Sequence, residues 1–226
     1  MDDPHYLFYE CENQNCGLRF PGYEGALRGN RCPICRSNTH MVAFVESTTD
    51  KTSHEGIQST WRVDALLDNI RSAWNVGAIF RTADGTGIHK IYLCGVTPTP
   101  ENSKVRKTSL HAEENIPWEH SKNGVKTAVK LKSQGHLLWA LEDLPDSVPL
   151  FQVDVSNLNS PHVLIVGNEV CGVDPGLLEV CDQVISIPML GKKQSYNVAI
   201  AFSIAVSFLL YRHSVSQGSF NILPSI

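Results

Sequence analysis

The chain has 226 residues, 42% of them hydrophobic, with 19 lysines and arginines against 23 aspartates and glutamates, a formal net charge of −4. This length suits one large domain, or one medium domain with a small appendage, and the composition suffices for a buried core. The net charge does not mark a nucleic-acid binder, so such binding would need a local basic patch. No apolar run of about 18 residues is free of polar breaks, and Met1–Glu10 lacks a signal-peptide core, so we expect a soluble, cytoplasmic protein without a membrane partner.

Four of the seven cysteines form two early pairs, Cys11 with Cys16 and Cys32 with Cys35. Two pairs on tight turns can present four thiolates tetrahedrally to zinc, and so small a unit would need a metal to be stable. The first pair has C-x4-C spacing instead of the usual C-x2-C, and four unligated cysteines are the alternative. We predict a zinc-ribbon-like domain at residues 1–46 that holds a structural Zn²⁺ ion.

This predicted domain also carries four arginines, which leave its function open: Arg19, Arg28, Arg31 and Arg36. The unit could clamp RNA phosphates or be purely structural. The stretch that follows, residues 47–60, is polar and aperiodic, and it is predicted to be a linker to a larger domain at residues 61–226.

Apolar residues recur from Arg62 to Ile70 at the start of the larger domain. A helix is predicted from about Asn75 to Ala83, ended by glycines, and a strand over Lys90–Gly95. Lys104–Trp118 is predicted to be a loop beside the strand end, and it carries the densest basic cluster of the chain: Lys104, Arg106 and Lys107.

The second half of the chain alternates helical and strand-like patterns. Lys122–Ser133 is predicted to be a helix with four inward residues, and a final helix is predicted over Asn197–Tyr211. The inward residues are Val125, Ala128, Val129 and Leu131. Strands are predicted at His136–Leu141, near Phe151–Val155, and at Val163–Val166 and Val184–Ile187. Because strands and helices alternate, we predict an α/β fold with a mostly parallel sheet.

Polar residues follow the last two predicted strands: Asn168 and Glu169 after one, Ser195 and Asn197 after the other. Ligands bind at such strand ends in open α/β sheets, so chemistry is expected there. The sequence contains no G-x-G-x-x-G, P-loop or G-x-S-x-G pattern. Arg81 stands in a predicted helix among apolar neighbours, and its simplest explanation is a surface pair with Asp84.

Three segments resemble, in order, the motifs of the SpoU/TrmH-type RNA ribose methyltransferases of the SPOUT superfamily. The first is N-I-R-S-A-W-N-V-G-A-I-F-R-T-A-D-G-T-G-I at 69–88, the second V-G-N-E-V-C-G-V at 166–173, and the third I-P-M-L-G-K-K-Q-S-Y-N-V-A-I-A at 187–201. Each motif alone is weak, but three in this order are specific. The similarity covers roughly Trp61–Arg212.

This resemblance implies a C-terminal trefoil knot in the sheet, with S-adenosylmethionine bound in the loops of the knot. The family's cofactor positions fall on Gly167, Ile187 and Tyr196, with Asn168 and Met189 nearby. The third motif commonly has leucine where this chain has Tyr196, and the larger ring can alter the adenine pocket. The resemblance also implies a homodimer through the final helix, although core packing would explain its apolar side equally well: Ile200, Ile204, Ser207 and Leu210.

The implied reaction is methyl transfer to a ribose 2′-hydroxyl of tRNA or rRNA, with catalytic positions at Asn75, Arg81, Glu169, Ser195 and Asn197. Because an arginine stays protonated, Arg81 would position the hydroxyl and stabilise negative charge instead of removing the proton. Glu169 and Asn75 would orient Arg81 or the RNA. Ser195 and Asn197 would fix the loop and the acceptor ribose, and either also suits a helix N-cap.

Two other functions stay open at this point. The chain could be a non-catalytic RNA-binding or assembly protein that keeps the fold, or an enzyme of the same superfamily that methylates a base. The Arg81-bearing first motif favours ribose over base.

Overall fold

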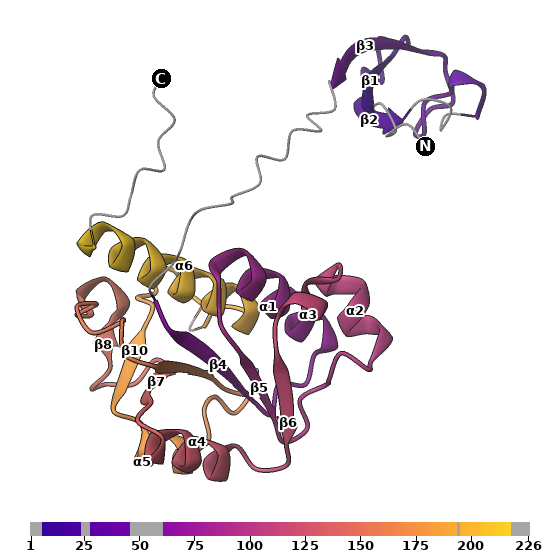
Figure 1. The fold of residues 1–226 in the computed structure, drawn as a ribbon. Coiled ribbons are helices and arrows are strands. Elements are labelled where there is room, and N and C mark those ends of the chain that lie inside the picture. The colour runs from indigo at the N-terminus through magenta and orange to yellow at the C-terminus, as the bar shows by residue number, and fades with distance from the viewer. Residues whose placement is uncertain (1–5, 24–27, 46–60, 194, 218–226) are drawn as a thin grey trace. The chain divides into compact units, whose positions relative to one another are not determined.

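The computed structural model describes residues 6–23, 28–45, 61–193 and 195–217 (Figure 1). The chain divides into two compact units, Met1–Ile57 and Gln58–Ile226. The predicted linker, residues 47–60, lies outside the described residues.

In the first unit, three described strands form an antiparallel sheet in the order β2-β1-β3. They are β1 (Tyr6–Cys11), β2 (Arg19–Tyr23) and β3 (Thr39–Val45), with a short 3-10 turn, η1 (Arg28–Asn30), before the second cysteine pair. The ring of Tyr9 is buried and stacks on Phe20 at 5.9 Å between ring centroids. So small an apolar core needs support from another source.

In the second unit, seven described strands form one sheet in the order β6-β5-β4-β9-β7-β10-β8, and every neighbouring pair is parallel. This confirms the predicted α/β class. The strands are β4 (Val63–Asp68), β5 (Ile91–Cys94), β6 (Trp118–Ser121), β7 (Leu137–Leu141), β8 (Val148–Pro149), β9 (His162–Val166) and β10 (Gln183–Ser186). The central strands β4 and β9 are buried along their whole length, as expected for a sheet covered on both faces.

Helices cover both faces of this sheet, with α1 and α6 on one side and α4 and α5 on the other (Figure 1). The helical elements are α1 (Ala73–Thr86), α2 (Ser103–Ser109), α3 (Ala112–Asn115), α4 (Gly124–Ser133), the 3-10 turn η2 (Leu150–Gln152), α5 (Pro175–Val180) and α6 (Val198–Ser216). Leu67 packs under α1 and α6, whereas its neighbour Leu66 packs under α4 and α5. The sheet therefore separates two apolar cores.

Most predicted elements of this unit are confirmed within a few residues, but three predictions are wrong. The predicted loop Lys104–Trp118 contains α2 and α3, and Asn102 caps α2 by accepting from the Lys104 amide at 3.0 Å. The predicted strand Phe151–Val155 is replaced by η2. Val129 on α4 is 50% exposed, and Thr127 is buried instead.

Helix α6 has two apolar sides with different environments. Its buried side packs into the core: Ala199, Phe202, Ala205, Val206 and Leu209. On the other side, Ile200 is 52% exposed, whereas Ile204 and Leu210 pack partly against the same core, so core packing accounts for only part of the apolar side predicted to be an interface. The helix is also long and apolar enough to cross a membrane by length and composition, with a mean hydropathy of 1.6. The core contacts of its buried side account for part of this composition.

A close approach between α1 and α2 depends on Gly77. A β-carbon at this position would lie 2.6 Å from the Val105 carbonyl oxygen and 2.7 Å from the Thr108 β-carbon. Backbone and a β-branched residue cannot yield easily, so glycine is required here. Gly85 lies on the same helix, and a β-carbon there would meet nothing within 4 Å.

This contrast predicts opposite effects of one substitution. Gly77→Ala should destabilise the chain by about 2 kcal/mol, because the added methyl group pushes α2 away from α1. Gly85→Ala should stabilise it by up to about 1 kcal/mol, because alanine favours the helix. Urea unfolding of both variants measures the difference. A Gly77→Ala chain as stable as Gly85→Ala would contradict the packing described here.

Candidate functional site

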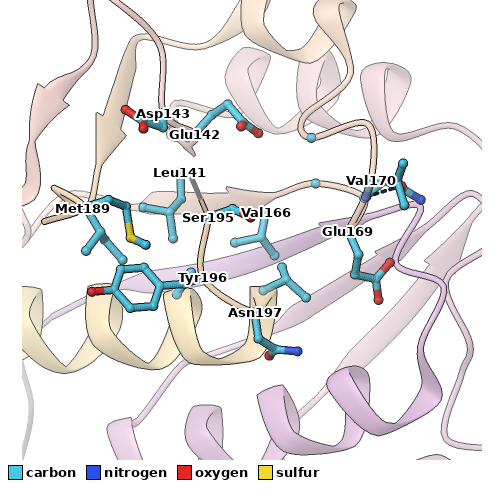
Figure 2. A pocket seen from close by; sticks show the side chains of 16 residues that line it. Leu141, Glu142, Asp143, Val166, Glu169, Val170, Met189, Ser195, Tyr196 and Asn197 are labelled. Atoms are coloured by element: carbon cyan, nitrogen blue, oxygen red, sulfur yellow. Dashed lines mark hydrogen bonds between the residues drawn. The ribbon is translucent and has the colours of Figure 1, made fainter. Parts of the chain in front are cut away.

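A cavity of about 430 Å³ opens at the carboxyl ends of β7, β9 and β10 (Figure 2). Three segments line it, one at the end of each strand. They supply Leu141–Asp143, then Val166–Val170 with Gly172, and then Ile187, Met189, Ser195–Val198 and Ala201. Figure 2 shows Met189 and Tyr196 at one end, and Glu169 and Val170 at the other. The loops after β9 and β10 carry the second and third motif segments, where the resemblance implies a knot, whose threading stays a prediction.

The loop after β9 folds back on itself tightly. The backbone groups of Asn168 and Gly172 exchange two hydrogen bonds of 2.9 Å. A β-carbon on Gly167 would lie 2.2 Å from the Gly172 carbonyl oxygen, so only glycine fits there. The Asn168 side chain accepts from the Val170 and Cys171 amides and donates to the Asn69 carbonyl at 2.7 Å. Asn168 therefore holds the loop and ties it to the segment before α1.

Glu169 places its carboxylate at the N-terminus of α1. Its oxygens accept from the Arg71 amide at 2.8 Å, the Ser72 amide at 3.0 Å and the Asn75 side-chain nitrogen at 2.9 Å. Partial burial opposes ionisation, but the hydrogen bonds from these three donors outweigh it and lower the pKa of Glu169 below its ordinary value. An ionised carboxylate with three donors is a poor proton acceptor and a good positioning group.

Two asparagines continue this network to α6. Because the Asn75 nitrogen donates to Glu169, its side-chain oxygen is left to accept from the Asn197 side-chain nitrogen at 3.0 Å. The Asn197 oxygen in turn accepts from the Ala199 and Ile200 amides and caps α6. The predicted N-cap role of Asn197 is thereby confirmed, and one chain of hydrogen bonds connects all three motif segments.

The structure brings most of the predicted site residues together. The cavity lining includes every predicted cofactor position, together with three predicted catalytic positions: Gly167, Asn168, Ile187, Met189 and Tyr196, with Glu169, Ser195 and Asn197. Asn75 belongs to a second, shallower cavity of about 350 Å³, shared with Arg71, Ser72 and Glu169. Glu169 lines both cavities and so connects them.

Arg81 is the predicted site residue that this cluster does not include. It lies nearly two helical turns beyond Asn75, is exposed, and lines neither cavity. Within the described part of the chain its guanidinium makes no hydrogen bond or ion pair, and Asp84 accepts from Asn115 instead at 3.2 Å. The surface pair that the sequence first suggested is therefore absent from the described residues.

Two acidic residues of the cavity wall escaped the sequence analysis, Glu142 and Asp143. Glu142 accepts from the Val173 amide at 2.9 Å and so braces the loop after β9. Their position in the sequence does indicate a site, because both residues directly follow the predicted strand His136–Leu141. Asn168 and Glu169 follow the predicted strand Val163–Val166 in the same way. The end of this strand therefore predicts site residues for the same reason as the ends of the two later strands.

The four early cysteines lie together in the first unit. Their sulfur atoms all lie within 4.8 Å of one another, with Cys11 and Cys35 at 3.4 Å and Cys16 and Cys32 at 3.8 Å. Tetrahedral bonds of about 2.3 Å to zinc place sulfur atoms about 3.8 Å apart. The donor set and spacing therefore fit a tetrahedral metal site.

A parallel sheet with a three-loop cavity at its strand ends defines an α/β protein with a candidate ligand site at those ends. The SpoU rRNA Methylase family matches residues 63–207, and the chain belongs to this family. The match begins after the cysteine-bearing unit.

The chain is similar to relatives that act on different RNAs. It is 33% identical over 142 residues to the tRNA (guanosine(18)-2′-O)-methyltransferase of Aquifex aeolicus, covering 62% of this chain and 64% of that protein. It is 31% identical over 171 residues to the 23S rRNA (guanosine-2′-O-)-methyltransferase RlmB of Neisseria meningitidis, covering 74% and 66%. The match thus spans somewhat less than two thirds of each of these relatives.

Solved structures give the same picture. A TrmH/SpoU tRNA modifying enzyme of Aquifex aeolicus is 29% identical with a TM-score of 0.61, covering 70% of this chain and 77% of that one. An AdoMet-bound rRNA methyltransferase of Sinorhizobium meliloti is 28% identical with a TM-score of 0.61, covering 67% and 56%. The fold prediction is confirmed by these similarities.

The Glu169 network predicts a pH-dependent contribution to stability. A pKa below the ordinary value of 4.5 means that the stabilisation is present above that value and is lost as pH falls through the folded-state pKa. Glu169→Gln turns an amide nitrogen toward backbone donors and should therefore lower the melting temperature at pH 7. The difference in melting temperature from wild type should become smaller toward about pH 3. Glu179→Gln on α5 is the matched control. A deficit that does not change with pH would contradict this account.

Proposed function

We propose that this chain transfers the methyl group of S-adenosylmethionine to a ribose 2′-hydroxyl of tRNA or rRNA. The observation that carries the proposal is the chain of hydrogen bonds from Glu169 through Asn75 to Asn197, which joins all three motif segments beside one cavity. The names of the relatives described above support the same reaction and leave the choice of RNA open.

The larger cavity suits the cofactor. Its volume of about 430 Å³ falls in the usual range of small-molecule sites. Gly167 lets the backbone approach closely, and Ile187 and Met189 supply apolar walls, while Glu142 and Asp143 put negative charge near a cationic ligand. The bound cofactor supplies a methyl group on a positively charged sulfur. Tyr196, 42% exposed where the family commonly has leucine, would cover one end.

The chain's own residues then orient the acceptor. The 2′-oxygen forms the new bond to carbon as the sulfur–carbon bond breaks, and the hydroxyl proton leaves to water or an RNA phosphate. Glu169 is already ionised and fully engaged, so its role is to hold Asn75 and the start of α1 in place. Ser195 and Asn197 fix the loop beside the acceptor ribose. Holding the methyl donor and the acceptor hydroxyl at the reacting distance and orientation can lower the barrier by several kcal/mol.

Arg81 would stabilise the charge that develops on the 2′-oxygen. Helical side chains tilt toward the N-terminus, so its guanidinium can extend back over the small Ala78 toward the first turn, where Asn75 lies. Its freedom from partners within the described residues leaves it available to RNA. A permanent positive charge suits this role and excludes that of a simple base.

A homodimer and a cytoplasmic location belong to the same proposal. The exposed apolar side of α6, centred on Ile200, is the surface we assign to a second copy of the chain. Burial of this side of α6 against the same side of a second copy would remove apolar area from water, as in other two-fold interfaces. We also propose that the cysteine cluster holds a structural Zn²⁺ ion, since a sheet this small lacks a sufficient core.

Two alternatives have distinct signatures. A non-catalytic RNA-binding protein would bind RNA without binding S-adenosylmethionine in a calorimetric titration. A base methyltransferase would leave its methyl group on the base in the nucleoside mass spectrum of treated total RNA. Asn75, Glu169 and Asn197 are intact and connected, which favours an enzyme over the non-catalytic protein. The Arg81-bearing first motif favours ribose over base.

Arg81→Ala should lower methyl transfer to total RNA at least about a hundredfold, because the developing charge loses its stabilising group. The variant should keep its melting temperature and its affinity for S-adenosylmethionine, since Arg81 lines neither cavity. Transfer of labelled methyl groups measures the rate, with Lys126→Ala on the far side of the sheet as control. Full activity of Arg81→Ala would refute the assigned role.

Gently purified protein should contain about one zinc ion per chain by elemental analysis, because four thiolates form one closed tetrahedral site. Cys32→Ser should lose the metal and unfold the first unit, whereas Cys171→Ser should keep it, because that exposed cysteine lies outside the cluster. Metal-free protein with a folded first unit would remove the zinc assignment.

A further inference from the structure

One side of α1 faces solvent with a composition that packing does not explain. Trp74, Ala78, Arg81 and Gly85 follow one another at spacings of three or four residues, so they share one side of the helix. Trp74 is 51% exposed, and Arg81 and Gly85 are exposed as well. We call these four residues the outer face of α1.

The packing of α1 uses its other sides. Gly77 meets α2, and Thr82 contacts Ser203 of α6 at 2.8 Å between hydroxyl oxygens. The sheet-facing side supplies the buried residues Val76, Ile79, Phe80 and Ala83. The outer face therefore lies between the α2 and α6 contacts; Ala78 packs partly against the core, whereas Trp74, Arg81 and Gly85 are exposed. An indole left half in water stabilises the fold less than a fully buried one, since burial is what makes such a ring stabilising.

Exposed cationic side chains occur on α1 itself, just before it and on the adjoining α2. Within the described residues the guanidinium groups of Arg71 and Arg81 make no hydrogen bond or ion pair, although the Arg71 amide binds Glu169. Lys104 and Lys107 are exposed on the adjoining α2. The one acidic residue of α1, Asp84, is held by Asn115. An exposed aromatic ring among free cationic groups is the chemistry that binds single-stranded nucleic acid, through base stacking and phosphate contacts.

The outer face is also continuous with the site. Trp74 directly precedes Asn75, and Arg71 lines the same shallow cavity as Asn75. Since helical side chains lean toward the N-terminus, Arg81 can reach over Ala78 toward Trp74. A base stacked on the indole would thus lie beside the guanidinium that we assign to the acceptor.

We propose that Trp74 stacks on a nucleobase of single-stranded RNA next to the methyl-accepting nucleotide, with Arg71 on an adjoining phosphate. This role rests on the proposed RNA methyl transfer and adds a substrate-positioning residue to it. It selects unpaired RNA, because a base inside a duplex cannot offer its face to a side chain.

The test compares wild type with Trp74→Ala and Trp74→Phe, using a pool of fluorescein-labelled 12-nucleotide random single-stranded RNAs. By fluorescence anisotropy, Trp74→Ala should bind about tenfold more weakly, and Trp74→Phe should recover most of the loss because it keeps a stacking ring. Trp74 is the most exposed of the four tryptophans, so RNA should quench the intrinsic fluorescence of wild type and much less that of Trp74→Phe.

Three controls separate stacking from folding and catalysis. Affinity for S-adenosylmethionine and the melting temperature should not change in Trp74→Ala, and Val129→Ala, an exposed apolar residue across the sheet, should behave as wild type. Arg71→Gln should reduce the slope of log affinity against log salt by about 0.7, the value of one phosphate contact to a single strand.

The outcomes are distinct. Equal RNA affinity and equal quenching in wild type and Trp74 variants, with methyl transfer intact, would overturn the stacking role and leave the proposed function standing. A wild-type chain that binds no RNA would overturn both. A Trp74→Ala chain that elutes at half the wild-type mass would assign the outer face to a second copy instead and so overturn the stacking role.

Discussion

The carboxylate of Glu169 at the start of α1 is the contact on which the site depends. The first amides of a helix have no partner within the helix and carry partial positive charge, so an anion there is stabilised by hydrogen bonds and by the helix dipole. Here the anion comes from a loop almost a hundred residues further along the chain, and it fixes the segment between β4 and α1 against the loop after β9. Asn75 passes this constraint to Asn197 and hence to the beginning of α6. Two helix starts and one strand end are thereby held in a single arrangement.

Glycines allow this arrangement to close. Gly167 lies against the Gly172 backbone, and Gly172 itself has a φ of +74° and would direct a β-carbon into the Glu142 carboxylate. Gly77 likewise allows the close approach between α1 and α2. Gly77 of the first motif and the two glycines of the second are thus explained by close contacts, and the asparagines and the glutamate by the hydrogen bonds that such contacts make possible. Loop shape is set by sterics first, and the polar network then holds it.

Patterns that depend on local chemistry were predictable from the sequence. The β-branched runs located β9 and β10, and the cysteine spacing located the cluster in the first unit despite the longer C-x4-C turn. Helix α2 was missed because Val105 is the one large apolar residue in its seven, which leaves no periodicity to detect. Its stability comes from the Asn102 cap and from contact with α1, and the second of these is invisible before the fold is known. For the same reason the sequence could name Arg81 but not its distance from the cavity, because that depends on how α1 is rotated against the sheet.

The polar groups of the site divide into two sets with different freedom to change. The first set makes its hydrogen bonds within the set and to backbone groups, so a substitution in any member disturbs the whole arrangement. Its members are Asn168, Glu169, Asn75 and Asn197. The outer face of α1 is free of this constraint, because Trp74 and Arg81 contribute little to packing and have free polar or aromatic surface. With the proposed function, a chain built this way can keep one cofactor site and one geometry while the outer face changes to fit another RNA. The choice of substrate would then depend on the exposed side of the same helix whose first turn is held by Glu169.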